Sequence, residues 1–263
     1  MSSARSKMQD EVVTILDNRK INEKYFKLTF ASKKLSRGVV PGQFLQLQIQ
    51  PTFDPLLRRP FSYYRIKGER VEVLYEILGR GTGILSQKGK GSRVRILGPL
   101  GNPFSKPKAK KTTVLVAGGI GLPPLVFFAE KNKVDYLLIG GKSKAEVLPK
   151  SELSKVSGKV LYATNDGSYG KKGFVTVLLD ELIHQQEDPR NLFVQTCGPK
   201  VMMQAVIDLA RKYEIPGEAS IDETMGCGVG ACLGCMVETD KGLVPSCVEG
   251  PVFAFDSIRQ SLV

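Results

Sequence analysis

Four cysteines near the C-terminus, Cys227, Cys232, Cys235 and Cys247, are the residues of this chain whose type and spacing best suit chemistry. They follow the pattern C-x4-C-x2-C-x11-C, and the first three lie in a glycine-rich loop at 225–236. Glycine adopts backbone angles that other residues resist, so such a loop can wrap closely around a small inorganic core. The spacing is typical of plant-type 2Fe–2S sites. The sequence therefore predicts that these four thiolates hold a 2Fe–2S cluster, which transfers electrons one at a time.

Two other interpretations of the cysteines stay open. Structural zinc sites usually contain two closely spaced cysteine pairs, or one pair with histidines. Here the last thiol stands alone, and the only histidine, His184, is far away in the sequence. Disulfides suit short secreted chains, whereas this chain has 263 residues and its first 20 lack the apolar core of a signal peptide. A 2Fe–2S site is favoured over both.

Composition and charge limit the class of protein. The apolar fraction of 42% is ordinary for a soluble globular protein. The longest apolar stretch, 113–129, is interrupted by glycines and prolines and is short for a bilayer crossing, so no membrane span is expected. The formal net charge is +12, but the lysines are scattered and no nucleic-acid-binding motif accompanies them. These features predict a cytoplasmic protein with reduced thiols that does not bind nucleic acid.

The pattern of apolar residues changes twice along the chain and predicts a multidomain protein. Residues 1–105 contain alternating segments such as 44–50, separated by turn signals, as in an antiparallel β-barrel. Residues 111–215 instead alternate short apolar runs with helical stretches, which indicates an α/β domain with a parallel sheet. Residues 216–263 form a small C-terminal cysteine module, the expected 2Fe–2S module.

Two motifs in the predicted barrel could bind a flavin. The segment 58–63 reads Arg-Arg-Pro-Phe-Ser-Tyr, and it is followed downstream by Gly-Arg-Gly-Thr-Gly at 79–83. The guanidinium of an arginine presents a planar fork of donors that suits a phosphate. Glycines at a helix start leave backbone N–H groups free for a pyrophosphate. Taken singly, each motif is also compatible with an ordinary surface segment or turn.

A third motif could bind a dinucleotide. The apolar run 113–117 is followed by Gly-Gly-Ile-Gly at 118–121 and then by Pro123 and Pro124. Proline is favoured in the first turn of a helix, so the expected order is strand, glycine turn, helix. This order is the setting in which such a turn binds a nicotinamide dinucleotide. The sequence does not separate NAD from NADP.

Taken together, the motifs resemble a known family. Arg-Pro-Phe-Ser at 59–62, Gly-Gly-Ile-Gly at 118–121 and Cys-Gly-Pro at 197–199, in that order, resemble the ferredoxin–NADP reductase superfamily. The cysteine loop at 225–235 and the closing segment Cys-Val-Glu-Gly-Pro-Val-Phe at 247–253 narrow the resemblance. The whole chain is similar to the electron-transfer subunits of dihydroorotate dehydrogenase type B.

The resemblance implies how FAD would lie along the barrel. It places Arg59 on the pyrophosphate and Ser62 near the isoalloxazine ring. It also places residues 75–77 along the cofactor, with Gly81 and Thr82 at the phosphates.

The resemblance further implies that Gly119 and Gly121 face the dinucleotide and that residues 197–199 lie beside the nicotinamide. The expected cofactor-binding residues are Arg59, Pro60, Phe61, Ser62, Tyr75, Glu76, Ile77, Gly81, Thr82, Gly119, Gly121, Cys197 and Gly198. No catalytic acid or base is expected, because hydride transfer needs stacked rings rather than a side-chain acid.

The implied function is electron transfer in pyrimidine biosynthesis. A partner subunit would oxidise dihydroorotate on FMN, and electrons would pass through the 2Fe–2S cluster and FAD to NAD+, in a heterotetramer with two copies of each chain. Related chains serve sulfide dehydrogenases and NADH-dependent ferredoxin–NADP oxidoreductases. A stand-alone NAD(P)H-dependent reductase, and a zinc-stabilised interaction module without activity, are further alternatives.

Overall fold

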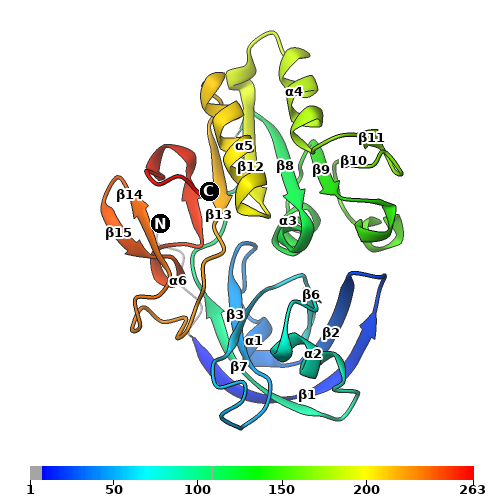
Figure 1. The fold of residues 1–263 in the computed structure, drawn as a ribbon, viewed down its shortest axis with the longest axis vertical. Helices are drawn as coiled ribbons and strands as arrows, with labels where there is room; N and C mark the ends of the chain where they lie inside the picture. Colours follow the sequence, from blue (N-terminus) through cyan, green and yellow to red (C-terminus); the bar gives the residue numbers. More distant parts are fainter. Residues whose placement is uncertain (1–7, 108) are drawn as a thin grey trace.

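The computed structural model describes residues 8–107 and 109–263, which form two seven-stranded sheets and one two-stranded sheet (Figure 1). The strands of the first sheet are β1 (Gln9–Lys20), β2 (Tyr25–Ala31), β3 (Phe44–Gln48), β4 (Arg59–Ser62), β5 (Arg65–Lys67), β6 (Arg70–Glu76) and β7 (Arg93–Leu100). Their order is β4-β3-β7-β1-β2-β6-β5, and all the pairings are antiparallel. Two short helices, α1 (Lys33–Ser36) and α2 (Arg80–Ser86), connect strands of this sheet. The predicted antiparallel barrel is confirmed.

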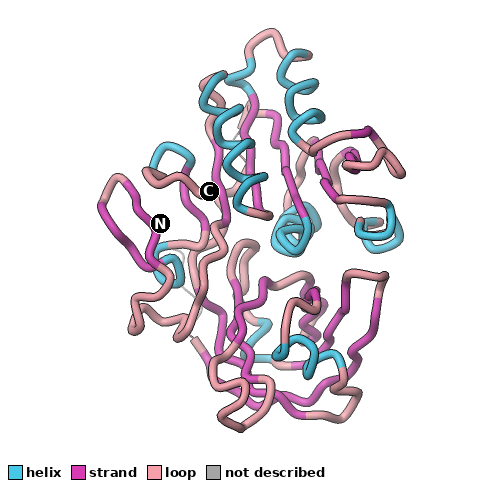
Figure 2. The backbone as a smooth tube through the Cα atoms, in the orientation of Figure 1, coloured by secondary structure: helices cyan, strands magenta, loops and turns pink. Residues whose placement is uncertain are grey.

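The second sheet has the order β11-β10-β9-β8-β12-β13-β16. Its strands are β8 (Thr112–Gly118), β9 (Tyr136–Gly141), β10 (Lys159–Thr164), β11 (Lys171–Lys172), β12 (Leu192–Cys197), β13 (Gly217–Ser220) and β16 (Val252–Ala254). The pairings are parallel except that between β13 and β16. The longer helices are α3 (Leu122–Lys131), α4 (Thr176–His184) and α5 (Lys200–Lys212), which gather around this sheet (Figure 2). The predicted α/β architecture is confirmed.

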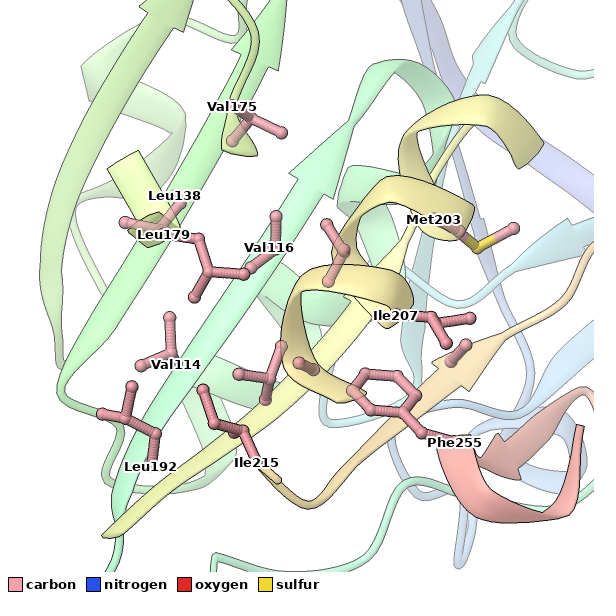
Figure 3. Close-up of a cluster of buried hydrophobic side chains, with 14 of the residues drawn as sticks. Val114, Val116, Leu138, Val175, Leu179, Leu192, Met203, Ile207, Ile215 and Phe255 are labelled. Carbon is pink, nitrogen blue, oxygen red and sulfur yellow. The ribbon is translucent and has the colours of Figure 1, made fainter. Parts of the chain in front are cut away.

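Helices cover both faces of the second sheet, and β8 shows why. Its residues are buried on alternate sides: Val114 and Val116 pack with α4 and α5, whereas Leu115 and Ala117 pack with α3. Figure 3 shows the first of these two cores, where Val116 lies with side chains from both covering helices. A strand buried on both faces reads as a continuous apolar run, which is the pattern of 113–117. The described residues after the barrel also form five 3-10 segments: η1 (Gly119–Gly121), η2 (Lys144–Glu146), η3 (Lys150–Leu153), η4 (Pro189–Asn191) and η5 (Phe255–Ser257).

The C-terminal segment holds the hairpin β14 (Met236–Thr239) and β15 (Gly242–Pro245), followed by α6 (Ser246–Glu249). The chain then returns to the second sheet, because β16 pairs with β13 at its edge. The cysteine segment is therefore hydrogen-bonded to the α/β sheet. The predicted limits 1–105, 111–215 and 216–263 stay a prediction.

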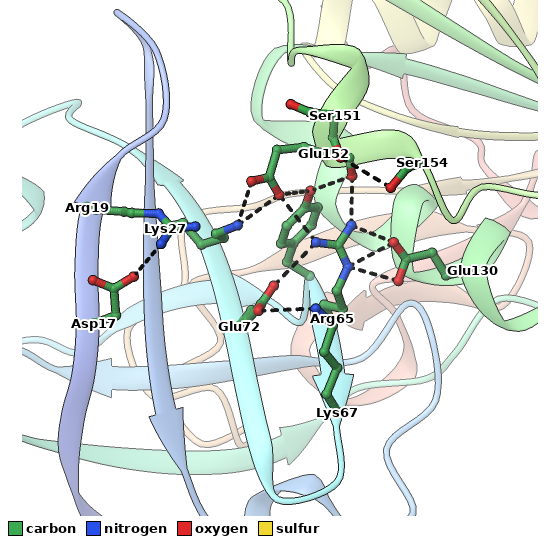
Figure 4. Close-up of polar contacts among 11 residues, drawn as sticks. Asp17, Arg19, Lys27, Arg65, Lys67, Glu72, Glu130, Ser151, Glu152 and Ser154 are labelled. Atoms are coloured by element: carbon green, nitrogen blue, oxygen red, sulfur yellow. Dashed lines mark hydrogen bonds and ion pairs between the residues drawn. The ribbon is translucent and has the colours of Figure 1, made fainter.

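A buried charge network joins the barrel to the α/β part (Figure 4). Arg65 of β5 donates from Nε to both carboxylate oxygens of Glu130 on α3, at 2.8 and 2.9 Å. Its Nη1 lies 3.3 Å from Oε2 of Glu152 on η3 and 3.4 Å from Oε2 of Glu72 on β6. Lys27 of β2 donates to Glu152 at 2.6 Å. Burial raises the pKa of the Glu152 carboxyl, but hydrogen bonds from Lys27 and Arg65 outweigh burial and hold the pKa below its usual value.

Candidate functional site

A cleft of about 600 Å³ lies between the barrel and the carboxyl end of the second sheet. Its sheet wall comes from the residues that follow three parallel strands, β8, β12 and β13. Its barrel wall comes from β4, β6 and the start of α2. After β8 the chain adds β9 and β10 on one side of β8, and it later adds β12 and β13 on the other side. The direction in which strands are added to the sheet therefore reverses at β8. Open α/β sheets bind ligands at such a reversal, outside the carboxyl ends of the strands.

The cleft brings together the sequence-predicted cofactor residues, with one exception. The predicted residues that line it are Arg59, Pro60, Phe61, Ser62, Tyr75, Glu76, Gly81, Thr82, Gly119, Gly121, Cys197 and Gly198. Ile77 is not among the lining residues, and its side chain is 45% exposed. Segments more than 100 positions apart in the sequence thus share one cavity. The roles assigned to the individual residues stay predictions.

The barrel wall of the cleft contains an arginine side chain, a backbone segment packed closely against it, and two aromatic rings. A Cβ atom on Gly81 would lie 3.2 Å from Arg59 Nε, so the guanidinium packs directly against the start of α2. Thr82 Oγ1 accepts from the backbone N–H of Leu78 at 2.9 Å and closes this turn. Further along the wall, the rings of Phe61 and Tyr75 meet edge to face with centroids 5.9 Å apart. A guanidinium beside an aromatic wall suits a ligand that carries both phosphate and a flat ring.

The sheet wall depends on glycine at two positions. Gly119 has a φ of +51°, a backbone conformation that favours glycine. A Cβ on Gly121 would lie 2.3 Å from the carbonyl carbon and oxygen of Cys197 and from the nitrogen of Gly198. The glycine turn after β8 is therefore packed backbone to backbone against the residues that follow β12. This contact sets the position of both segments in the cleft.

Replacing Gly121 by alanine should deform this wall. Overpacking a tight contact typically costs about 1–3 kcal/mol, so we expect a loss of unfolding free energy in this range and weaker binding of nicotinamide dinucleotide. Urea unfolding and dinucleotide titration measure the two effects. The matched control is Gly83→Ala on α2, where an added Cβ meets nothing within 4 Å. Equal behaviour of the two variants would contradict the close-packing argument.

Cys197 lines the cleft as a neutral thiol. Burial raises its pKa to about 12, and the negative charge of Asp222 adds to the shift, although a hydrogen bond with Ser220 opposes it. A thiol with such a pKa carries no thiolate near neutral pH and is not a nucleophile. The group is therefore suited to contact a ring rather than to react with it.

The cysteine loop orients its sulfur atoms with backbone N–H groups. The N–H of Gly230 points to Cys247 Sγ at 3.1 Å, and the N–H groups of Val229 and Cys232 point to Cys227 Sγ, each at 3.4 Å. Slight burial raises the pKa of the Cys227 thiol, but these hydrogen bonds outweigh burial and lower it to about 6. At Cys227 the loop therefore favours the thiolate, the form in which cysteine binds metal, whereas burial and the hydrogen bond with Cys235 raise the pKa of the Cys247 thiol to about 12.

The four thiols are arranged as two pairs. Cys227 is in hydrogen-bond contact with Cys232, and Cys247 with Cys235. Two pairs fit two iron atoms with two thiolates each, whereas a structural zinc ion needs all four ligands around one centre. The donor set and its pairing fit a 2Fe–2S cluster better than zinc.

The cleft and the cysteine loop share a wall that sequence reasoning missed. Phe44 of β3 and Met225 line the cleft, and both pack in one apolar cluster with Cys235 and Cys247. The same two side chains therefore contact both sites. Apolar and polar residues alternate in 44–50. This alternation indicates that the strand has one buried face, on which Phe44 could lie, but not which segment of the chain covers that face.

Comparisons with known proteins identify the family. Residues 222–259 match the family model described as the iron–sulfur cluster binding domain of dihydroorotate dehydrogenase B. The dihydroorotate dehydrogenase B (NAD(+)) electron transfer subunit of Desulforamulus reducens is 38% identical over 86% of this chain and 89% of its own length. The chain belongs to this family. The corresponding subunit of Bacillus pumilus is 35% identical over 97% of this chain and its full length, at 100%. The resemblance predicted from the motifs is confirmed.

Solved structures agree with this assignment. The structure of an NADH-dependent reduced ferredoxin–NADP oxidoreductase covers 98% of this chain and 91% of its own, with 26% identity and a TM-score of 0.83. A ferredoxin reductase of carbazole 1,9a-dioxygenase, at 16% identity and a TM-score of 0.69, shares the fold over 81% of this chain and 68% of its own. The chain is an oxidoreductase subunit with the ferredoxin reductase fold. In the described residues, no helix combines the length and apolar character needed to cross a bilayer.

Proposed function

We propose that this chain carries electrons from a dihydroorotate-oxidising, FMN-containing partner to NAD+ in pyrimidine biosynthesis. The observation that carries the proposal is the shared wall: Phe44 and Met225 contact both the cleft and the paired cysteines. FAD bound in the cleft would supply the chemistry that joins one-electron and two-electron transfer. The cytoplasm is the proposed compartment, since four reduced thiols suit it.

The residues around the cleft support a division of binding roles. We infer that Arg59 holds the flavin pyrophosphate, because its guanidinium lies beside Gly81 at the start of α2. Ser62 follows Phe61 in β4 and lines the cleft, and we propose that it contacts the flavin ring. Gly119 and Gly121 would receive the dinucleotide phosphates, with the Cys197 thiol beside the nicotinamide. These residues bind and orient; none has to donate or accept a proton.

The surface near the cysteine loop supports a partner on that side. Leu233 and Val229 of the loop are exposed, as is Leu57 of the loop before β4. A Cβ on Gly226 would lie 4.0 Å from Leu57 Cδ1, so this leucine borders the cysteine loop. Exposed apolar side chains beside an exposed ligand such as Cys232 suit the docking of a partner subunit. We propose that the catalytic subunit docks here, in a heterotetramer with two copies of each chain.

The proposed function is tested by isolating the chain with its natural partner. A tagged chain should co-purify from native cells with a subunit that oxidises dihydroorotate, and the complex should reduce NAD+ with orotate as product. Oxidation of sulfide by the co-purifying subunit, or reduction of NADP+ from reduced ferredoxin and NADH, would instead support an alternative. Because this chain is similar to the ferredoxin–NADP oxidoreductase, reduction of NADP+ from reduced ferredoxin and NADH should be assayed in parallel.

Removing the cation of the flavin site should weaken FAD binding. A hydrogen bond to a charged group contributes about 1.5–3 kcal/mol, so Arg59→Ala should raise the dissociation constant of FAD by roughly 10- to 150-fold. Equilibrium titration of the flavin-free chain measures this change. The neighbouring Arg58 is the matched control, because its guanidinium is bound to Asp10 at 3.2 and 3.0 Å. Equal losses in the Arg59→Ala and Arg58→Ala variants would remove Arg59 from the proposed role.

A further inference from the structure

The side chain of Gln46 is a buried amide without a partner. It is 0% exposed, and neither Nε2 nor Oε1 has a hydrogen-bond partner among the described residues. Buried polar groups are nearly always paired, so each exception calls for an explanation such as an ion or ligand that completes the pairing. In β3 the neighbours Leu45 and Leu47 point into the barrel core. Because side chains alternate along a strand, Gln46 points to the outer face, where Phe44 also lies.

The cysteine loop covers this amide directly. A Cβ on Gly228 would lie 2.7 Å from Gln46 Cγ and 3.0 Å from Gln46 Nε2. Gly228 has a φ of +75°, and it immediately follows the cluster-ligand candidate Cys227. The backbone of the loop can approach the amide this closely only because position 228 has no side chain. The amide nitrogen therefore lies beneath the loop that carries the sulfur atoms.

The same amide lies between the two proposed cofactor sites. Within the first sheet, Gln46 is paired with Pro60 of β4, which lines the cleft. Two residues earlier on the same face, Phe44 packs with Cys235 and Cys247. The loop already directs backbone N–H groups to sulfur, from Gly230 to Cys247 and from Val229 and Cys232 to Cys227. A side-chain N–H at Gln46 would extend this set of donors from the barrel side.

We propose that the Gln46 amide donates a hydrogen bond to an inorganic sulfide of the iron–sulfur site and thereby raises its reduction potential. The inference rests on the proposed function, in which the four cysteines hold a 2Fe–2S cluster. Reduction adds negative charge to the sulfur atoms, so a donor stabilises the reduced form more than the oxidised form. Gln46 is thus a positioning and tuning residue that makes no bond to iron.

The test compares wild type with Gln46→Met, which keeps the length of the side chain and removes the donor. After anaerobic cluster reconstitution, a reductive titration followed by electron paramagnetic resonance gives the midpoint potential. We expect a shift to lower potential; a tenfold change in the reduction equilibrium corresponds to about 59 mV for one electron. Pulsed resonance of the reduced cluster should also lose the coupling to one exchangeable proton. Gln48→Met, on the same face of β3 and partly exposed, should leave both signals unchanged.

A second variant and a cluster-free measurement keep the inference falsifiable. Gln46→Glu preserves the shape of the side chain and replaces the donor by an acceptor, so the midpoint potential of the cluster should fall below that of Gln46→Met. If the Gln46→Met chain fails to assemble a cluster, Gln46→Glu replaces it in the test. Unchanged potentials in both loaded variants overturn the inference. A lower melting temperature of the cluster-free Gln46→Met chain would also overturn it, by showing that the amide pairs with protein or water. A wild-type chain that holds no cluster would instead refute the proposed function itself.

Discussion

Replacing Cys247 by serine should abolish electron transfer from the partner while leaving the flavin half of the chain intact. The thiol is buried, comes from α6 rather than from the loop, and receives the N–H of Gly230 at 3.1 Å. Loss of groups that merely support a metal ligand costs 10–100-fold in metal affinity or activity. Loss of the ligand itself should therefore lower dihydroorotate-dependent NAD+ reduction by at least about 100-fold. NADH-dependent reduction of an artificial acceptor, which needs only the cleft, should persist.

The measurement has to separate cluster loss from misfolding. Iron and sulfide content and the visible spectrum report the cluster, while flavin content reports the folded barrel. Cys197→Ser is the matched control for iron content, since Cys197 lies in the cleft and not in the loop. A Cys247→Ser chain that retains both iron atoms, or a wild-type chain that contains zinc in their place, would contradict the ligand assignment.

Local sequence signals predicted the parts of the site that depend on local conformation. Gly121 lies in a glycine turn that follows an apolar strand, a local signal, whereas Cys197 is placed in the site by the family resemblance. Both residues lie at the ends of neighbouring strands, at the same edge of the sheet. The carboxyl ends of neighbouring parallel strands necessarily meet, so the cleft could be inferred before the structure. The resemblance places Ile77 along the cofactor with Tyr75 and Glu76. In the structure Ile77 lies just past the end of β6 and is exposed, and its role stays a prediction.

Features that depend on contacts between distant segments had no local signal. The edge pairing of β16 with β13 joins residues about 30 positions apart around the cysteine loop, and a three-residue strand has little pattern of its own. Gln46 looked like one of the polar residues of a half-exposed strand. Its burial follows from the loop that covers it, which alternation along β3 cannot reveal.

The charge network could not be predicted from the sequence either. Charged residues are usually solvated, and no sequence motif around Arg65 indicates that it is buried. In the structure its side chain is only 8% exposed, as is that of its partner Glu130. The network links β5 of the barrel to α3 and η3 of the α/β part, so it spans the same two parts that form the cleft. We infer that it fixes their relative orientation.

Replacing Arg65 by methionine should therefore have the largest effect on stability. The change leaves Glu130 without its ion-pair partner, and Glu152 keeps only Lys27 as an ion-pair partner besides the Tyr64 hydroxyl, so buried negative charge is uncompensated. Removing one member of a buried ion pair typically costs about 3–5 kcal/mol. Urea unfolding of the apo chain should show this loss. Arg19→Met is the matched control, because Arg19 is exposed and its pair with Asp17 should contribute at most about 1 kcal/mol.

The pH dependence of the variant provides a separate check on the mechanism. In the native chain the pKa of Glu152 is lowered, so its contribution to stability is present above the unfolded pKa and is lost as pH falls through the folded pKa. Without Arg65 the folded pKa should move up, and the stability gained from ionised Glu152 should shrink at neutral pH. The double variant with Arg65→Met and Glu130→Met should recover part of the lost stability, since both charges are then removed. A loss no larger than that of Arg19→Met would show that water, rather than the protein interior, surrounds the network.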